Sequence, residues 1–366
     1  VKANVRFYEE WFVLSLVVED GECCGAVVME IRSGEIHVLR AKAVIMASGG
    51  LGRIFEPSTN ALICTGDGMG LAYRAGAPLM DMEMVQYHPT TLKNSGVLIT
   101  EGARGEGAYL LNSKDDRFME RYAPNMMELA SRDVVSRAAQ TEINEGRGID
   151  GCVLLDCRHL GEIKIRQALS QILDIARDFA NVDIRTEPIP IRPGMHYQMG
   201  GIKTDVNGLT ALPGLYAAGE CACVSVHGGN RLGANSLLDT VVFGHRAGNH
   251  AAEVAAGMSY KSFNVEAWAE KEEQRIAQML ARESNGDRVA QIRREMGETM
   301  NQYLGVYRDE GGMTQALSAI RQLKERYARV PVEHKGRIFN TDLVFALELE
   351  LMLDCAETIV VSALER

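Results

Sequence analysis

Two charged residues follow a short apolar strand in the second half of the chain. Residues 212–248 read as a turn, a strand, a glycine-rich loop and a helix. Glu220 follows the strand, and Arg231 lies in the loop. Asn235 and Ser236 are residue types that favour helix starts, where free N–H groups attract electron-rich atoms. This pattern predicts a ligand site, and the alternative is an ordinary strand-to-helix crossover.

Two further glycine-rich turns have the residue types of a binding site. Ser48, Gly49 and Gly50 follow the apolar run 43–47, which is typical of a buried strand. Glycines at a strand end let the backbone approach a phosphate or a sugar closely. Asp67 stands between glycines before an Ala-rich helix, where it favours either the close approach of a ligand or a simple helix cap.

Charged residues in the middle of the chain stand where local structure does not require them. Glu101 and Arg104 lie among glycines, which favours a tight polar loop over a solvated face. Arg132 opens a helix predicted to run over 131–145, although a cation is unfavourable at a helix N-terminus. This misplaced cation indicates a function. His88 precedes a proline and is therefore predicted to be extended.

A mixed α/β fold is predicted to position these residues. Residues 1–47 predict a β-meander that leads into the buried strand. The polar, irregular stretch 82–195 predicts an inserted cap domain, and the Pro- and Gly-rich stretch 188–201 predicts a hinge back to the first domain. A bundle of amphipathic helices follows, predicted over 265–283, 287–304, 313–328 and 343–364. The predicted boundaries are 1–81 and 196–257 for the first domain, 82–195 for the cap and 258–366 for the helical domain.

Composition disfavours several classes of function. The 366 residues carry a net charge of −10 with acids and bases interspersed, which disfavours nucleic-acid binding. The sequence has no run of about 18 apolar residues that would predict a membrane span. The eight cysteines lack metal-binding spacing and predict buried thiols, with a redox role for Cys221 and Cys223 as the alternative. The chain begins at Val1 and ends within a helical pattern, which predicts a piece of a longer protein.

Seven motifs in this order resemble the flavoprotein subunits of succinate dehydrogenase and fumarate reductase. They are IMASGG at 45–50, TGDGMG at 65–70, QYHPT at 86–90, TEGARGEG at 100–107, RDVVSRA at 132–138, PIPIRPGMHYQMGG at 188–201 and AGECACVSVHGGNRLGANSLLDTVVFG at 218–244. The resemblance covers essentially the whole chain. It implies an incomplete FAD-binding, Rossmann-like domain with a β-meander, an inserted capping domain and a C-terminal helical bundle. The family's N-terminal dinucleotide-binding motif and its C-terminal segment are not in this sequence, so the isolated chain is expected to lack part of the cofactor site.

The resemblance implies oxidation of succinate to fumarate or the reverse, with hydride transfer to flavin N5. It implies that Arg132 exchanges a proton with the substrate and that Glu101 and Arg104 form its relay. Arginine is a poor acid in water, but it can serve a strongly basic, carbanion-like centre. The substrate carboxylates are implied to be held by His88, Thr100, His196 and Arg231. The implied FAD contacts are Ser48, Gly49, Gly50, Asp67, Glu220, Ser236 and Leu237, and no metal ligand is implied.

The resemblance also implies partners. These are an iron–sulfur subunit and, through it, a membrane anchor, which would place the chain on the cytoplasmic face of the inner membrane in electron transport and the tricarboxylic acid cycle. The alternatives are an L-aspartate oxidase-like enzyme or a soluble fumarate reductase. A non-catalytic flavin-binding or assembly piece is disfavoured, because His88, Arg132, His196 and Arg231 are all intact.

Overall fold

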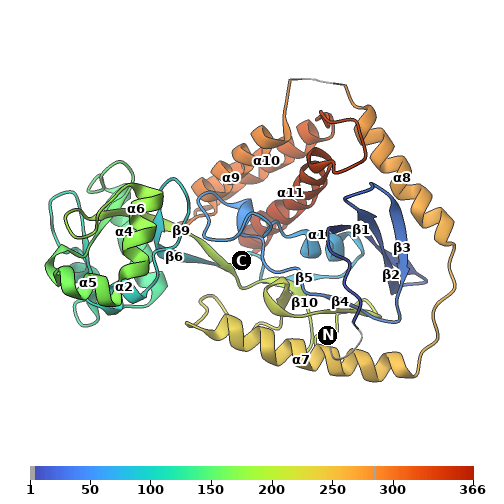
Figure 1. Cartoon of the computed structure of the whole chain (residues 1–366), viewed down its shortest axis with the longest axis horizontal. Coiled ribbons are helices and arrows are strands. Elements are labelled where there is room, and N and C mark those ends of the chain that lie inside the picture. The colour runs from blue at the N-terminus through green and yellow to red at the C-terminus, as the bar shows by residue number, and fades with distance from the viewer. Residues whose placement is uncertain (1–4, 284–285) are drawn as a thin grey trace.

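Helices and strands alternate along the chain, which confirms the predicted mixed fold. The computed structural model describes residues 5–283 and 286–366. Figure 1 shows a green cap lobe set apart from a larger body. Two neighbouring strands run between them, β6 (Val85–Leu92) and β9 (Ile189–Gln198).

The N-terminal segment forms the predicted antiparallel meander. Its strands are β1 (Trp11–Glu19), β2 (Glu22–Glu30) and β3 (Ile36–Arg40), in that order. Asp20 and Gly21 join the first two strands with positive φ angles, as a tight hairpin requires.

The helix α8 (Val265–Ala281) lies against this meander (Figure 1). Its Ile276 and Met279 are buried in one core with Leu14 and Val17 of β1. The same core contains Leu343 and Leu347 of the last helix, so α8 packs between the meander and the C-terminal helices.

Two parallel strands from distant parts of the chain lie side by side. β4 (Val44–Met46) pairs with β11 (Leu215–Ala217), and Leu215 is opposite Val44. Because both strands end at the same edge, the residues that follow them emerge together. In open α/β sheets this edge is where ligands bind.

The cap contains a four-stranded sheet in the order β6-β9-β8-β7. Its other strands are β7 (Tyr109–Leu111) and β8 (Val153–Asp156). Most of the stretch 188–201 is the strand β9, which pairs with β6 and β8 and leads from the cap back to the main body (Figure 1), and the hinge there stays a prediction. The cap helices are α2 (Gly102–Gly105), α3 (Met119–Tyr122), α4 (Arg132–Asn144), α5 (Glu162–Ala168) and α6 (Ser170–Ala180).

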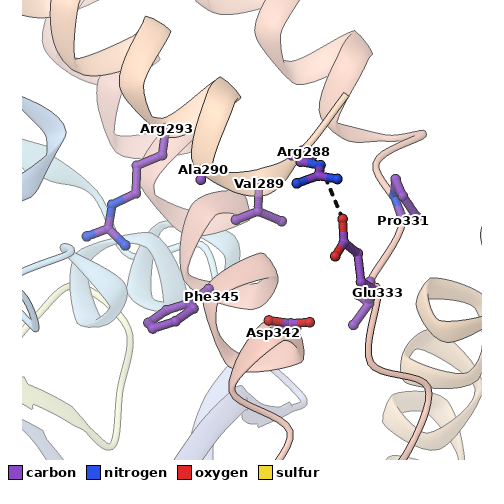
Figure 2. A pocket seen from close by; sticks show the side chains of 9 residues that line it. Arg288, Val289, Ala290, Arg293, Pro331, Glu333, Asp342 and Phe345 are labelled. Atoms are coloured by element: carbon purple, nitrogen blue, oxygen red, sulfur yellow. Dashed lines mark ion pairs between the residues drawn. The ribbon is translucent and has the colours of Figure 1, made fainter. Parts of the chain in front are cut away.

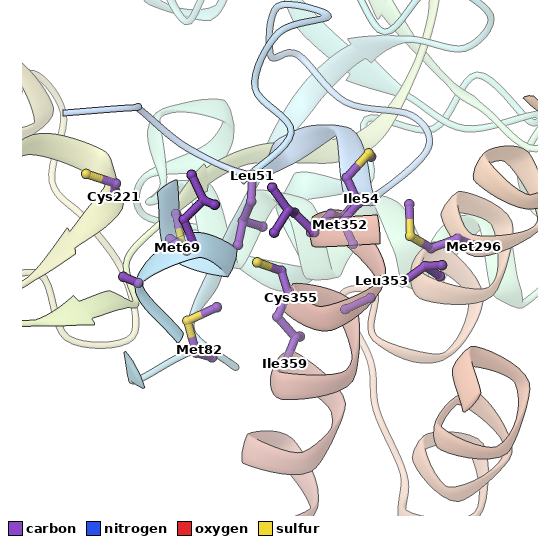
Figure 3. Close-up of a cluster of buried hydrophobic side chains, with 14 of the residues drawn as sticks. Leu51, Ile54, Met69, Met82, Cys221, Met296, Met352, Leu353, Cys355 and Ile359 are labelled. Carbon is purple, nitrogen blue, oxygen red and sulfur yellow. The ribbon is translucent and has the colours of Figure 1, made fainter. Parts of the chain in front are cut away.

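The longest helix, α11 (Thr341–Glu365), runs through the main core. Its N-cap is Asn340, whose side-chain oxygen accepts the Leu343 N–H at 2.9 Å, as predicted for this helix start. α9 (Val289–Tyr303) and α10 (Glu310–Tyr327) pack against it. Figure 3 shows its inner side chains meeting the site-bearing segments, with Met352, Leu353, Cys355 and Ile359 beside Leu51, Ile54 and Met69.

The remaining elements connect these layers. They are α1 (Asp67–Arg74), α7 (Asn235–Ala256), β5 (Leu79–Met80), β10 (Gly201–Lys203) and β12 (Ala222–Cys223). Among the described residues, no helix combines the length and the apolar character that crossing a membrane requires.

Candidate active site

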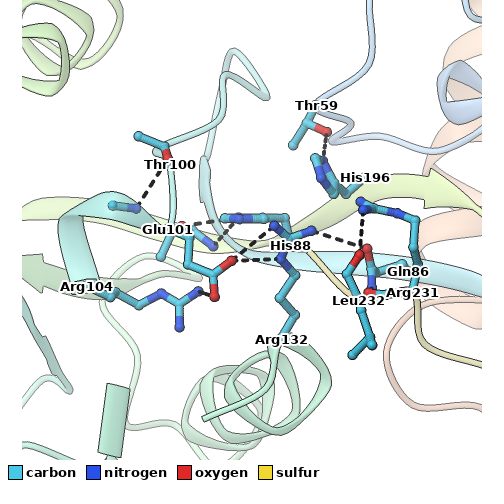
Figure 4. Close-up of polar contacts among 12 residues, drawn as sticks. Thr59, Gln86, His88, Thr100, Glu101, Arg104, Arg132, His196, Arg231 and Leu232 are labelled. Atoms are coloured by element: carbon cyan, nitrogen blue, oxygen red, sulfur yellow. Dashed lines mark hydrogen bonds and ion pairs between the residues drawn. The ribbon is translucent and has the colours of Figure 1, made fainter. Parts of the chain in front are cut away.

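Arg132 begins the helix α4, as predicted, and its guanidinium is held by a carboxylate. Nε and Nη2 lie 3.1 and 3.0 Å from the same oxygen of Glu101 (Figure 4). Ser131 precedes the helix, but its hydroxyl donates to Asp133 at 2.6 Å and does not cap a backbone N–H. Charge-assisted contacts to Glu101 therefore stabilise the cation at this unfavourable position.

Arg104 lies on the far side of Glu101 and is fully buried. Its Nη2 is 3.6 Å from the second carboxylate oxygen of Glu101, and its Nη1 donates to the Glu128 carbonyl at 2.5 Å. Burial lowers the pKa of Arg104, and the charge of Glu101 opposes this effect. The half-exposed Glu101 therefore lies between both arginines, hydrogen-bonded to Arg132 and within ion-pair distance of Arg104.

Gln86 connects the group of Glu101, Arg104 and Arg132 to the loop that carries Arg231. Its side-chain oxygen accepts from Arg132 Nη1 at 3.4 Å, while its Nε2 donates to the Arg231 carbonyl at 2.7 Å. The same Nε2 donates to Asn230 at 2.7 Å, and Asn230 Nδ2 donates to Asp133 at 3.0 Å. The predictions missed Gln86 and Asn230. Gln86 shares a strand face with His88 two residues later, and that spacing is the signal that points to it.

His88 and His196 meet across strands β6 and β9, with ring centroids 5.1 Å apart. In the register Gln86 is opposite Tyr197 and Tyr87 is opposite Met195, so His196 is the extra residue of a β-bulge. Bulges re-aim side chains next to functional sites. The bulge is a feature of pairing, so the sequence did not predict it.

Both imidazoles are held neutral at ordinary pH. Burial, followed by the charges of Arg132 and Arg231, lowers the pKa of His196 to about 4. Burial also lowers the pKa of His88 far below its usual value. Because the Thr90 N–H donates to Nδ1 of His88 at 3.3 Å, the proton of the neutral ring is on Nε2. His196 Nδ1 is 2.8 Å from the Thr59 hydroxyl, a partner that the sequence did not reveal.

Arg231 is buried and incompletely satisfied. Its guanidinium lies 4.3 Å from the ring centroid of Tyr197, and Nη1 donates to the Leu232 carbonyl at 3.0 Å. Its Nε is buried without a hydrogen-bond partner. Burial and the charge of Arg132 lower its pKa. A buried cation with an unused donor is costly unless an anion neutralises it.

Thr100 precedes Glu101 at the exposed edge of this cluster (Figure 4). Its hydroxyl accepts the Gly102 N–H at 3.2 Å and holds the turn into α2. All the predicted carboxylate-holding and proton-relay residues therefore lie in one region, where the cap meets the main body.

The predicted cofactor residues lie at the carboxyl ends of β4 and β11. Gly50 lies against Glu220, and a Cβ at Gly50 would stand 2.4 Å from Oε1. This oxygen accepts the Gln198 N–H at 2.9 Å, and burial raises the pKa of Glu220 to about 7. Ser48 lies against Gly68 in the same way. Ser48 is exposed, and Gly49 is half-buried. A buried carboxyl and an exposed hydroxyl beside glycines suit the hydroxyls and phosphates of a dinucleotide.

Two expected helix caps are wrong. Ala234, with φ of 63°, precedes α7, so Asn235 and Ser236 lie inside its first turn and no side chain caps it. The N–H groups of Asn235 and Leu237 donate to the backbone carbonyls of Leu232 and Ala234, at 3.2 and 3.0 Å. Leu237 follows and is 72% exposed. Asp67 is the first residue of α1 after Gly66 and accepts the Thr65 hydroxyl at 2.6 Å, so it is not a cap.

Two other features do not belong to this cluster. A cavity of about 350 Å³ lies between α9 and the start of α11 (Figure 2), but both of its arginines are paired, Arg288 with Glu333 at 3.3 Å and Arg293 with Glu348 at 3.5 Å. The described cysteines are free thiols, and all but Cys64 are buried, as predicted. Burial raises the pKa of Cys223 to about 12, which disfavours the redox alternative.

Comparison with known families agrees with this geometry. Residues 1–237 match an FAD binding domain, and residues 293–366 match a fumarate reductase flavoprotein C-terminal domain. The fumarate reductase flavoprotein subunit of Mycobacterium tuberculosis is 47% identical over the whole chain. The succinate dehydrogenase flavoprotein subunit of Rickettsia felis is 45% identical over the whole chain. The chain spans 66% and 63% of these two relatives, which is less than two thirds of their length.

Solved structures show the same similarity. Quinol fumarate reductase of E. coli matches 100% of this chain and 65% of its own, with a TM-score of 0.95 and 42% identity. Sdh1 of Mycobacterium smegmatis matches 100% of this chain and 61% of its own, with a TM-score of 0.89 and 36% identity. The family match makes FAD the cofactor, and the donors and glycines at the ends of β4 and β11 fit it.

Proposed function

Because the chain belongs to the FAD-binding family of fumarate reductase and succinate dehydrogenase flavoprotein subunits, we propose that it interconverts succinate and fumarate. One observation carries this proposal. Arg132, bound to Glu101, lies in the same cluster as the buried Arg231 and two neutral histidines. Such a cluster has cations and donors for two carboxylates and one strongly held proton donor.

The substrate would lie between these groups. Arg231 would bind one carboxylate through its unused Nε, and the Nε2–H of His88 would donate to the same ligand. His196 and Thr100 complete the proposed set of donors. Fixed donors in a site with little water favour charge that develops on the substrate during the reaction.

Arg132 would move the proton. In fumarate reduction it would give a proton to the substrate carbon, and Glu101 with Arg104 would restore that proton from solvent. In succinate oxidation the proton would travel the other way. FAD, when bound, supplies the two-electron acceptor or donor that none of these side chains can provide. Seven residues are proposed to hold it: Ser48, Gly49, Gly50, Asp67, Glu220, Ser236 and Leu237.

Turnover tests this function. The full-length polypeptide containing this sequence is loaded with FAD and assayed for succinate oxidation with an artificial electron acceptor, and for fumarate reduction with a reduced dye. L-Aspartate is the comparison substrate. Turnover of the C4 dicarboxylates is expected, whereas oxidation of L-aspartate without it would contradict the proposal.

The names of the relatives also support an assembly. An iron–sulfur subunit would carry the electrons onward, and a membrane anchor would hold that subunit at the cytoplasmic face of the inner membrane. Co-expression with candidate subunits, followed by size-exclusion chromatography and iron analysis, tests this assembly. A flavoprotein that elutes alone and transfers electrons to no iron–sulfur partner would contradict it.

The division into 1–81 with 196–257, 82–195 and 258–366 belongs to the same proposal. A buried core drawn from residues between 92 and 191 supports an independent cap, while the position of α8 on the meander weakens the last boundary. Native-state hydrogen exchange tests it, since cap amides are expected to open as one cooperative unit.

A further inference from the structure

A polar cavity, different from the one between α9 and α11, lies between the cap and the helices of the main body. Its volume is about 340 Å³. Four elements line it: the strand β6 through Tyr87, the helix α4, the strand β9 through Arg192, and the end of α9 with the residues that follow. The volume is in the range of pockets for small ligands.

Arg192 is the charged residue of this cavity, and nothing in the described part of the chain pairs with it. Among the described residues its buried Nε has no hydrogen-bond partner, and no carboxylate lies within ion-pair distance of its guanidinium. Among the described residues that line the cavity, none is acidic. Most other arginines of the cap are paired, as Arg147 is with Glu142 at 2.8 Å. An unpaired, partly buried guanidinium is unfavourable and is satisfied best by an oxyanion, which its planar fork fits.

Neutral donors surround the guanidinium. Gln140 and Asn144 reach the cavity from α4, and Gln140 Nε2 donates to the Asn144 side-chain oxygen at 2.8 Å. This bond leaves the Asn144 amide N–H groups as donors. Asn301 and Gln302 bring two more amides from the end of α9. A single cation among primary amides is a donor set for a small anion.

The walls of the cavity are also connected. The Tyr307 hydroxyl is 2.8 Å from the Thr141 hydroxyl and donates to the Arg137 carbonyl at 3.2 Å. Below it, the Tyr87 hydroxyl donates to the Leu304 carbonyl at 3.4 Å. The first two contacts join α4 to Tyr307, and the third joins β6 to the end of α9.

We propose that this cavity is a second binding site, in which Arg192 and the amides around it hold a small oxyanion, a carboxylate or a phosphate. The site is separate from the His88 and Arg231 cluster and takes its ligand outside the proposed reaction. An anion bound there contacts α4 and α9 at once. It therefore ties the helix that carries Arg132 to the helical part of the main body.

Arginine side-chain NMR tests the site directly. The full-length polypeptide containing this sequence, labelled with ¹⁵N-arginine, is titrated with inorganic phosphate and, separately, with acetate at constant ionic strength. The Nε–H signal that disappears in Arg192→Gln is assigned to Arg192, and the signal assigned likewise to Arg231 reports on the other cluster in the same spectrum. We expect a saturable shift of the Arg192 signal with at least one anion, and the two titrations show which chemistry is preferred.

One further variant and a control complete the test. Asn144→Asp keeps the shape of the cavity but adds a negative charge, so affinity is expected to fall about tenfold or more, equivalent to about 1.4 kcal/mol. Arg294→Gln, exposed on α9 outside the cavity, is expected to leave affinity unchanged. The proposal is overturned if the Arg192 signal does not saturate with either anion, or if Asn144→Asp binds as tightly as the parent.

Discussion

The guanidinium of Arg132 and the carboxylate of Glu101 meet through two nitrogens and one oxygen, at 3.1 and 3.0 Å. Arg132 belongs to the first turn of α4, and Glu101 directly precedes α2. The pair thus joins two cap segments at the face that meets the main body. Since Glu101 is half exposed and Arg132 is largely covered, the pair connects solvent with the interior of the site.

Replacing Arg132 is expected to remove turnover and leave the fold intact. In Arg132→Gln, kcat should fall by about 10²–10⁴-fold or more, because a positioned proton donor is lost. The measurement is steady-state fumarate reduction by the FAD-loaded full-length polypeptide. Arg166→Gln, at an exposed cap position paired with Glu162, is the matched control and should keep full activity. If both variants have the same kcat, Arg132 does not transfer the proton.

Asn230 is expected to position the site through its contacts with Asp133 and Gln86. Asn230→Asp places a second carboxylate 3.0 Å from Asp133, so repulsion should move the loop of Arg231 away from α4 and lower kcat/KM about tenfold. Adding Asp133→Asn restores a donor and should recover much of the loss. Asn249→Asp, exposed on α7, is the control. A double variant no better than Asn230→Asp would mean that the contact does not position Arg231.

Glu348 of α11 is expected to make stability depend on pH. Burial, with a smaller contribution from Asp67, raises the pKa of this carboxyl to about 7, although Arg293 Nη1 lies 3.5 Å from it. Between about pH 4.5 and 7 the folded state keeps a proton that the unfolded state has lost. The free energy of unfolding should therefore fall as pH rises through this window.

Glu348→Gln removes that contribution. At pH 7–8 the variant should be more stable than the parent, by at most about 3 kcal/mol, and near pH 4 the two should be alike. Urea unfolding at several pH values measures this difference. In the variant, the free energy of unfolding should still fall somewhat with rising pH, because Glu220 titrates in the same window. Glu298→Gln, exposed on α9, should show no such effect, and a parallel pH profile for Glu348→Gln would refute the assignment.

Gly50 is expected to be needed for FAD binding. A methyl group at this position would lie 2.4 Å from Glu220 Oε1, so Gly50→Ala must displace the carboxyl from the proposed cofactor site. FAD affinity, measured by flavin fluorescence, should fall about tenfold or more. The control is Gly248→Ala, in the interior of α7, where an added Cβ meets nothing within 4 Å. Unchanged affinity in Gly50→Ala would show that Glu220 does not contact the cofactor.

The amino-acid sequence by itself determined the individual strands and helices of this protein. Apolar periodicity and glycine turns are local signals, so they predicted the meander, β4, β11 and the main helices. Motif order predicted the residues of the candidate site, and the unfavourable position of the Arg132 charge marked this residue as a candidate before any contact was known.

Only the tertiary structure decided how these parts meet. Pairing of β4 with β11, the bulge at His196 and the place of α8 are contacts between residues far apart in the chain. Closing the long loops between such residues costs conformational entropy, and only packing of the whole core offsets this cost. A short window of sequence does not contain the residues of that core. For the same reason, the bridge made by Gln86 and the unpaired Arg192 became visible only in the folded chain.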